Sequence, residues 1–170
     1  ARKVGVSTAL VSYVLNGLEK EKRVGDKVVI QIREAARELN YQPNQIARSL
    51  RRGSTKTIGL IVFDISNPFS AQITRVIEDE AVKNGFTVIF GSSDENRIKS
   101  GALIDTFLYR QVDGFIIAPV EGTASQIAAL IKKGIPVVLI DRYFPQLNVS
   151  HVILDNFQAT FDATNHLVKH

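Results

Sequence analysis

From residue 57 onward, short apolar runs alternate with longer segments of helical periodicity. The sequence IGLIVF (residues 58–63) is a continuous apolar run, typical of a strand buried on both faces of a sheet. Four similar runs follow, at residues 87–91, 114–119, 136–141 and 151–155. Helical stretches cover residues 69–84, 100–110, 124–133 and 157–169. This alternation predicts a parallel sheet with helices on both faces.

The first 57 residues have a different character, because they are strongly basic. They contain 12 Lys and Arg against 5 Asp and Glu, whereas residues 58–170 contain 9 against 12. A basic segment joined to a mildly acidic body suggests a nucleic-acid-binding module fused to another domain. A solvated basic face is the alternative interpretation.

The sequence GVSTALVSYVLNG (residues 5–17) predicts a helix whose exposed face carries no charge. Ser7 can cap its start and Gly17 can end it. A turn at Gly5 would complete a helix-turn-helix arrangement, in which the second helix meets base edges. The candidate base-reading side chains are small or form hydrogen bonds: Thr8, Ala9, Ser12, Tyr13 and Asn16. An ordinary amphipathic helix explains the pattern equally well.

Basic residues beside this helix are expected to contact phosphates, so that the neutral helix specifies sequence and its flanks supply affinity. They are Arg2, Lys3, Lys20, Lys22, Arg23 and Lys27. A further helix is predicted over residues 26–39. Its expected buried face is Val28, Val29, Ile32, Ala35, Ala36 and Leu39.

The sequence YQPNQIARSLRRGSTKT (residues 41–57) predicts a hinge that becomes ordered on DNA with its twin from a partner chain. Pro43 ends the preceding helix, Asn44 can cap a new one and Gly53 can end it. The short helix between them is marginal, because isolated helices below about 12–15 residues are marginal in water. Leu50 is a candidate wedge for a minor-groove base step. A solvated linker is the alternative.

Polar side chains follow each predicted strand, at the edge where parallel sheets bind ligands. They are Asp64, Asn67, Ser92, Ser93, Asp94, Glu121, Asp141, Arg142, Asp155 and Asn156, with Phe69 as a nearby aromatic ring. Carboxylates, amides and an arginine together suit a ligand with many hydroxyls. Taken singly, Asn67 and Asp155 fit helix caps as well.

Several kinds of chemistry have no motif in the sequence. It has no Gly-rich dinucleotide fingerprint, no P-loop and no Gly-x-Ser-x-Gly elbow. His151, His166 and His170 lack metal-ligand spacing, so we expect no metal site. Because no catalytic or cofactor-binding motif is found either, we expect no enzyme, no catalytic residue and no cofactor. Cysteine is absent, which fits the cytoplasm, and no run reaches the ~18 apolar residues of a membrane span.

The phrases GVSTALVSYVLNG, LNYQPNQIARSLRRGST and TIGLIVFDISNPF resemble the lactose-repressor (LacI/GalR) family of bacterial transcription regulators. GFTVIFGSSDEN, VDGFIIAPVEG, IPVVLIDR and VILDN match that family in the same order. The resemblance implies an all-α helix-turn-helix head at residues 1–42, with its first helix incomplete. It also implies a hinge helix and linker at 43–56. The first lobe of a periplasmic-binding-protein-like α/β core would occupy 57–170, with the second lobe absent and the chain truncated at both ends.

The same resemblance implies roles for particular residues. The family's base-reading positions match Thr8, Ala9 and Tyr13, and many members have Arg where Tyr13 stands. The hinge positions that contact the minor groove match Ala47, Leu50 and Arg51. The effector-binding positions of the first lobe match Asn67, Phe69, Asp94, Asp141, Arg142 and Asp155.

The resemblance implies a sequence-specific regulator, most often a repressor, that binds a pseudo-palindromic double-stranded operator as a homodimer in the cytoplasm. A small effector, most often a sugar, would bind between two lobes and change operator affinity. A transport-type sugar-binding protein is one alternative, but it needs an export signal and no DNA-binding head. An α/β enzyme is the other, and it needs a catalytic constellation.

Overall fold

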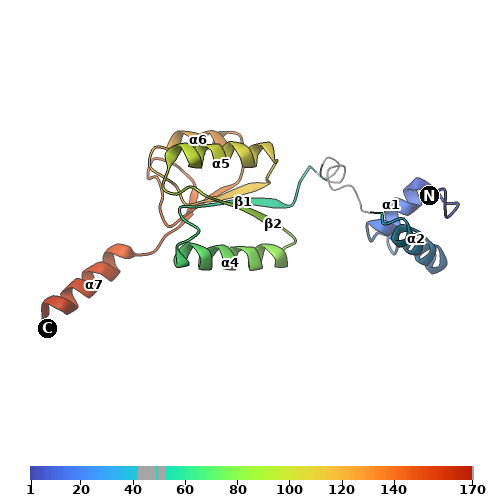
Figure 1. Cartoon of the computed structure of the whole chain (residues 1–170), viewed down its shortest axis with the longest axis horizontal. Helices are drawn as coiled ribbons and strands as arrows, with labels where there is room; N and C mark the ends of the chain where they lie inside the picture. Colours follow the sequence, from blue (N-terminus) through green and yellow to red (C-terminus); the bar gives the residue numbers. More distant parts are fainter. Residues whose placement is uncertain (42–48, 50–52, 170) are drawn as a thin grey trace. The chain divides into compact units, whose positions relative to one another are not determined.

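The computed structural model describes residues 1–41, 49 and 53–169 of the chain (Figure 1). The chain forms two compact units, Ala1–Arg51 and Arg52–His170. We call the first the head and the second the core, and treat each by itself. In the described part of the chain, no helix combines the length and hydropathy of a membrane span.

Over residues 1–41, the head is built on the helices α1 (Thr8–Leu15) and α2 (Asp26–Glu38). Three side chains form its buried centre: Val14, Val29 and Ile32. Partly buried valines and a leucine pack around them: Val4, Val6, Val11, Leu15, Val24 and Val28. The predicted helix over residues 26–39 is confirmed, but the expectation that Leu39 is buried is wrong. Leu39 is 63% exposed, because α2 ends at Glu38 and Leu39 is its C-cap.

Local hydrogen bonds set the ends of α1 as the sequence predicts. The Ser7 hydroxyl accepts from the Leu10 amide at 3.1 Å, which satisfies a free donor of the first turn. Gly17 has φ +72° and its amide donates to the Val14 carbonyl at 3.2 Å, so it ends the helix in a left-handed conformation.

The core contains a five-stranded sheet in the order β2-β1-β3-β4-β5, and all its pairs are parallel. The strands are β1 (Thr57–Val62), β2 (Thr87–Ser92), β3 (Gly114–Ile117), β4 (Val137–Ile140) and β5 (Ser150–Val152). The helices are α4 (Pro68–Lys83), α5 (Arg97–Tyr109), α6 (Ala124–Lys132) and α7 (Asn156–Lys169). The predicted alternation and the parallel sheet are therefore confirmed.

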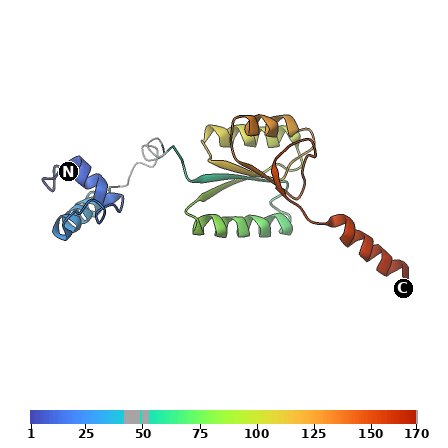
Figure 2. The same ribbon diagram turned by 180° about the vertical axis from the view of Figure 1, so that it is seen from behind.

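Helices cover both faces of this sheet. In the two opposite views, α4 lies on one face, and α5 and α6 lie on the other (Figures 1 and 2). The main apolar cluster joins side chains of α5 and α6, such as Phe107, to the strand residues Ile117 and Leu139. The helix expected from residue 100 begins at Arg97, because the Asn96 side chain caps it by accepting from the Lys99 amide at 3.0 Å. Helix α5 therefore begins directly after the short loop that follows β2.

Candidate DNA-binding surface and effector site

The exposed start of α1 carries the first candidate base readers. Thr8 and Ala9 are exposed on the first turn, whereas Ser12 and Tyr13 are half-buried further along the helix. The capping bond from Ser7 holds this turn in a helical conformation. The arrangement leaves a hydroxyl and a methyl group free to meet base edges.

Asn16 has a second task that the sequence did not reveal. Its side-chain amide donates to the Ser12 carbonyl at 2.6 Å and lies 3.2 Å from the Ser12 hydroxyl. Its Oδ1 is buried, with no hydrogen-bond partner among the described residues. Asn16 therefore caps α1, and its predicted base contact would need the side chain to turn away from Ser12.

Ion pairs hold several basic residues of the head in place. Lys22 lies 6.0 Å from the centre of the Tyr13 ring and 2.6 Å from the Glu21 carboxylate. Its hydrogen bond to Glu21 and the attraction of that charge raise the pKa of Lys22. The Lys22 ammonium thus lies near the Tyr13 ring and is paired with the Glu21 carboxylate. The predicted hinge residues Ala47, Leu50 and Arg51 lie outside the described residues, and their roles stay predictions.

At the carboxyl edge of the sheet, Asn67 orients the start of α4. Its Oδ1 accepts from the Phe69 amide at 2.9 Å, so it is a helix cap, as its place before Pro68 suggested. The cap sets the position of Phe69, whose ring is partly exposed. A ring presented in this way can stack on the apolar face of a sugar.

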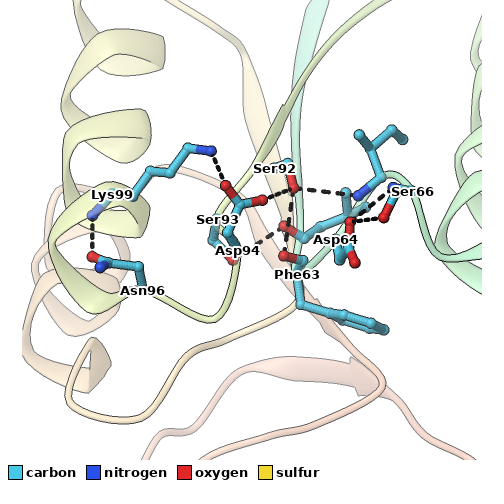
Figure 3. Close-up of polar contacts among 10 residues, drawn as sticks. Phe63, Asp64, Ser66, Ser92, Ser93, Asp94, Asn96 and Lys99 are labelled. Atoms are coloured by element: carbon cyan, nitrogen blue, oxygen red, sulfur yellow. Dashed lines mark hydrogen bonds and ion pairs between the residues drawn. The ribbon is translucent and has the colours of Figure 1, made fainter.

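A network of short polar contacts joins the ends of β1 and β2 (Figure 3). The Ser92 hydroxyl donates to Asp94 Oδ1 at 2.6 Å and accepts from the Ile65 amide at 3.3 Å. Asp94 also forms an ion pair with Lys99 on α5. The hydrogen bonds from Lys99 and then Ser92 lower the pKa of the Asp94 carboxyl, which keeps it ionised. These contacts hold the Asp94 carboxylate, a hydrogen-bond acceptor, in one position at the carboxyl edge of the sheet.

Arg142 reaches from the end of β4 to the loop after β2. Its guanidinium holds the Glu95 carboxylate with two contacts, Nη1 to Oε2 at 3.0 Å and Nη2 to Oε1 at 2.8 Å. Its Nε lies 3.7 Å from Asp141, and its Cζ lies 5.8 Å from the centre of the Phe63 ring. The bond to Glu95, more than the nearby charges, raises the pKa of Arg142. The Arg142–Glu95 ion pair therefore links two parts of the predicted site. Arg142 lies beside Asp141 at the end of β4, and Glu95 directly follows Asp94 in the loop after β2.

Sequence reasoning missed Glu95, although its position directly after Asp94 was a usable signal. Asp94 and Glu95 both have positive φ, +51° and +53°. Consecutive left-handed residues with side chains are strained, and such strain is often found at functional loops.

Asp155 stands apart in its contacts, because its Oδ1 accepts from the Gln158 amide at 3.0 Å and caps α7. Its predicted ligand role stays a prediction.

Within the described residues, no three or more His, Cys, Asp or Glu side chains are placed to hold a metal ion. The edge instead presents paired charges, hydroxyls and the rings of Phe63 and Phe69. Such groups can hold a polar ligand by hydrogen bonds and stacking.

Family models match almost the whole length of the chain. Residues 58–170 match the model described as "Periplasmic binding protein domain", which is more than half of the chain. Residues 1–44 match "Bacterial regulatory proteins, lacI family". The chain belongs to the LacI family. Its α/β core is the first lobe of a periplasmic-binding-protein-like fold, as predicted.

Two curated LacI-family relatives illustrate the similarity. A catabolite control protein A from Priestia megaterium is 38% identical over 168 residues, which cover 99% of this chain and 50% of the relative. A probable HTH-type transcriptional regulator EndR from Paenibacillus polymyxa is 32% identical over 170 residues, 100% of this chain and 49% of the relative. The chain spans about half the length of the curated relatives it matches. These LacI-family relatives are transcription regulators and not enzymes.

Solved structures support the LacI-family fold. A lac repressor dimer bound to operator and the anti-inducer ONPF superposes with a TM-score of 0.83 at 24% identity, over 99% of this chain and 51% of that chain. This likeness concerns the fold alone. A Cra transcriptional dual regulator from Pseudomonas putida, in complex with fructose 1-phosphate, has a TM-score of 0.64 at 28% identity, over 67% of this chain and 43% of that chain.

The contribution of the Glu95–Arg142 ion pair to the stability of this LacI-family core can be measured. Replacing Glu95 by Gln is expected to lower the free energy of unfolding by less than about 1 kcal/mol, because water screens exposed ion pairs. The two side chains are 46% and 53% exposed. Urea denaturation measures the change, with Glu121→Gln in the same unit as the matched control. A loss well above that of the control would show that the pair holds the fold together and is not free to exchange for a ligand.

Proposed function

We propose that this chain is part of a transcription regulator, a repressor, that binds operator DNA in a sequence-specific way. A small effector, a sugar, controls its operator affinity. Residues 1–42 are the DNA-binding domain, residues 43–56 the hinge, and residues 57–170 the first effector-binding lobe. The observation that carries the proposal is the joining of a LacI-family head to a periplasmic-binding-protein-like lobe in one chain.

The head supports the DNA-binding part of the proposal. The exposed start of α1 presents Thr8 and Ala9, while Ser12, Tyr13 and Asn16 follow along the helix. Lys22 beside Tyr13 adds a positive charge where a phosphate can be met. A transport-type binding protein has no use for such a head, and this favours the regulator over that alternative.

The carboxyl edge of the core supports the effector part. Asn67, Phe69, Asp94, Asp141, Arg142 and Asp155 are the proposed contacts from this lobe. Fixed acceptors, a paired guanidinium and an aromatic ring suit a ligand with many hydroxyls. The Cra regulator from Pseudomonas putida, similar to this chain, was solved with a sugar phosphate. A second lobe would close over the ligand and change how two hinges pair on DNA, a shift between two populations.

The first experiment selects bound sequences from a pool of random duplex DNA, using the full-length protein at near-physiological salt. We expect enrichment of a two-fold symmetric site with a flexible pyrimidine–purine step at its centre, because such steps are easily kinked. We propose that the protein acts in the cytoplasm as a homodimer, and the two-fold symmetry of such a dimer requires a two-fold symmetric site. Salt-sensitive binding without any enriched sequence, with and without added sugars, would contradict the proposal.

Leu50 tests the hinge part of the proposal. Replacing Leu50 by Ala is expected to weaken binding to the selected site roughly ten-fold, or about 1.4 kcal/mol, because the wedge that holds the kink is lost. Binding to non-specific duplex should stay nearly constant, since phosphate contacts supply it. Fluorescence anisotropy on both duplexes measures the two affinities, with Leu39→Ala as the matched truncation. Equal losses on the two duplexes would rule out a wedge.

A further inference from the structure

The last residues before β1 are fastened to the core by a single carboxylate. Asp113 lies directly before β3, and its Oδ2 accepts from the Ser54 hydroxyl at 2.6 Å and from the Lys56 amide at 2.7 Å. Its Oδ1 accepts from the Thr55 amide at 2.9 Å and lies 3.3 Å from the Thr55 hydroxyl. One side chain thus holds three consecutive residues that are nearly 60 positions away in the sequence.

Backbone contacts tie the same segment to both neighbours of β1. The Asp113 amide donates to the Thr57 carbonyl, and the Thr87 amide donates to the Lys56 carbonyl, both at 2.8 Å. The Lys56 ammonium lies 4.4 Å from the centre of the Phe86 ring. We call residues 54–56 with Asp113 the linker anchor. It joins the start of β1 to β2 on one side and to β3 on the other.

The linker anchor contains strained backbone, which indicates that its contacts determine its shape. Lys56 has φ +54°, and next to it the Thr55 hydroxyl donates to the Gln111 carbonyl at 2.8 Å. Residues with side chains avoid this region unless their surroundings hold them there. Here the hydrogen bonds to Asp113 and Gln111 supply that constraint.

The charge on Asp113 is part of the linker anchor. Partial burial raises the pKa of the Asp113 carboxyl, but the hydrogen bonds from Ser54, Thr55 and Lys56 outweigh it, so that the pKa lies below its usual range. The group is therefore ionised at neutral pH, and its hydrogen bonds are the stronger, charge-assisted kind. An amide in its place would offer one acceptor oxygen and turn an NH₂ group toward donors.

The position of the linker anchor suggests its use. Residues 54–56 are the last residues of the proposed hinge segment 43–56 and lead directly into β1 (Thr57–Val62), so the covalent path from core to head passes through them. We propose that Asp113 is a positioning residue that sets where the chain leaves the core, and that specific operator binding depends on it. This inference rests on the proposed function. Asp113 acts through the hinge and touches neither DNA nor effector.

The test uses the full-length protein and compares Asp113→Asn with Asp105→Asn. Asp105 is an exposed carboxylate on α5, so the control makes the same charge change in the same unit. Hydrogen exchange followed by mass spectrometry reports on the amides of residues 54–57. Anisotropy titrations report the affinity for the selected operator and for a non-specific duplex, and thermal melting reports the stability of the core.

For Asp113→Asn we expect at least ten-fold faster exchange at residues 54–57 and a roughly ten-fold loss of operator affinity. Non-specific binding should change less than two-fold, and Asp105→Asn should behave as wild type. Unchanged operator affinity together with faster exchange would overturn the coupling. Unchanged exchange would overturn the linker anchor itself.

A second pair of variants covers the case in which Asp113→Asn fails to fold. Ser54→Ala removes the hydroxyl that donates to Asp113 and accepts from the Lys56 amide, and Ser54→Thr keeps a hydroxyl. Loss of operator affinity in the first and its retention in the second would support the inference, whereas equal affinities would contradict it. If wild-type protein selected no operator, the proposed function would fail, while the exchange data would still decide whether the linker anchor exists.

Discussion

Replacing Ile32 by Ala is expected to unfold the head and abolish operator binding, while the core keeps its melting temperature. Ile32 is 2% exposed, and among the described residues of the head it forms the buried apolar centre with Val14 and Val29. Truncating such a side chain costs about 2–5 kcal/mol, because it removes contacts and leaves a cavity. A unit of about 50 residues has a total stability of roughly 3–8 kcal/mol. The substitution therefore removes most of what keeps the head folded.

The matched control lies two positions away on the same helix. Ile30 is 56% exposed, so Ile30→Ala should leave the head folded. Circular dichroism melts of the full-length variants separate the transitions of head and core, and anisotropy measures operator affinity. Wild-type operator affinity in the Ile32→Ala variant would show that the core of the head is larger than Val14, Val29 and Ile32.

Replacing Phe107 by Ala is expected to destabilise the core by about 3–5 kcal/mol, the usual cost of deleting a buried phenyl ring. Phe107 is 5% exposed on α5, and its ring centre lies 6.4 Å from that of Phe115 on β3. The ring also fills the space above Gly59 on β1, where an added Cβ would lie 2.7 Å from Phe107 Cδ2. Phe107 therefore joins α5 to two neighbouring strands at once.

Urea denaturation of the core transition measures this loss. Tyr109→Ala on the same helix is the control, because Tyr109 is 90% exposed and its truncation should change the unfolding free energy by less than ~0.5 kcal/mol. Similar losses in the two variants would mean that α5 does not hold the sheet through Phe107. A loss in the Phe107 variant alone would confirm that this ring connects the helix to β1 and β3.

Local signals predicted the secondary structure because they act over a few residues. The apolar runs and their helical neighbours appear in the structure in the predicted order. Where an end moved, a local cap explains it, as with Asn96 at the start of α5. Leu39 failed as a core prediction because helical periodicity continues past the residue where the hydrogen bonds of α2 stop. Periodicity indicates a face, but it does not show where a helix ends.

The candidate site was predicted only in part for a related reason. The polar residues after the strands were visible, since parallel strands bring their carboxyl ends to one edge. The sequence did not show which of these side chains pair with each other, because partners such as Glu95 and Arg142 are 47 positions apart. Asn16 was missed for another reason: its bond to Ser12 is local, but an exposed amide on the same helix would fit base reading equally well.

The sequence by itself determined the alternation of strands and helices, the caps of α1 and α4, and the basic head before a mildly acidic core. Each of these depends on composition, periodicity or a hydrogen bond within about four residues. Only the tertiary structure decided that Arg142 pairs with Glu95, that Phe107 fills the space above Gly59, and that Asp113 holds residues 54–56. These contacts form between residues 47 to 59 positions apart. They depend on the order and register of the strands, which bring distant residues together only after the sheet has formed.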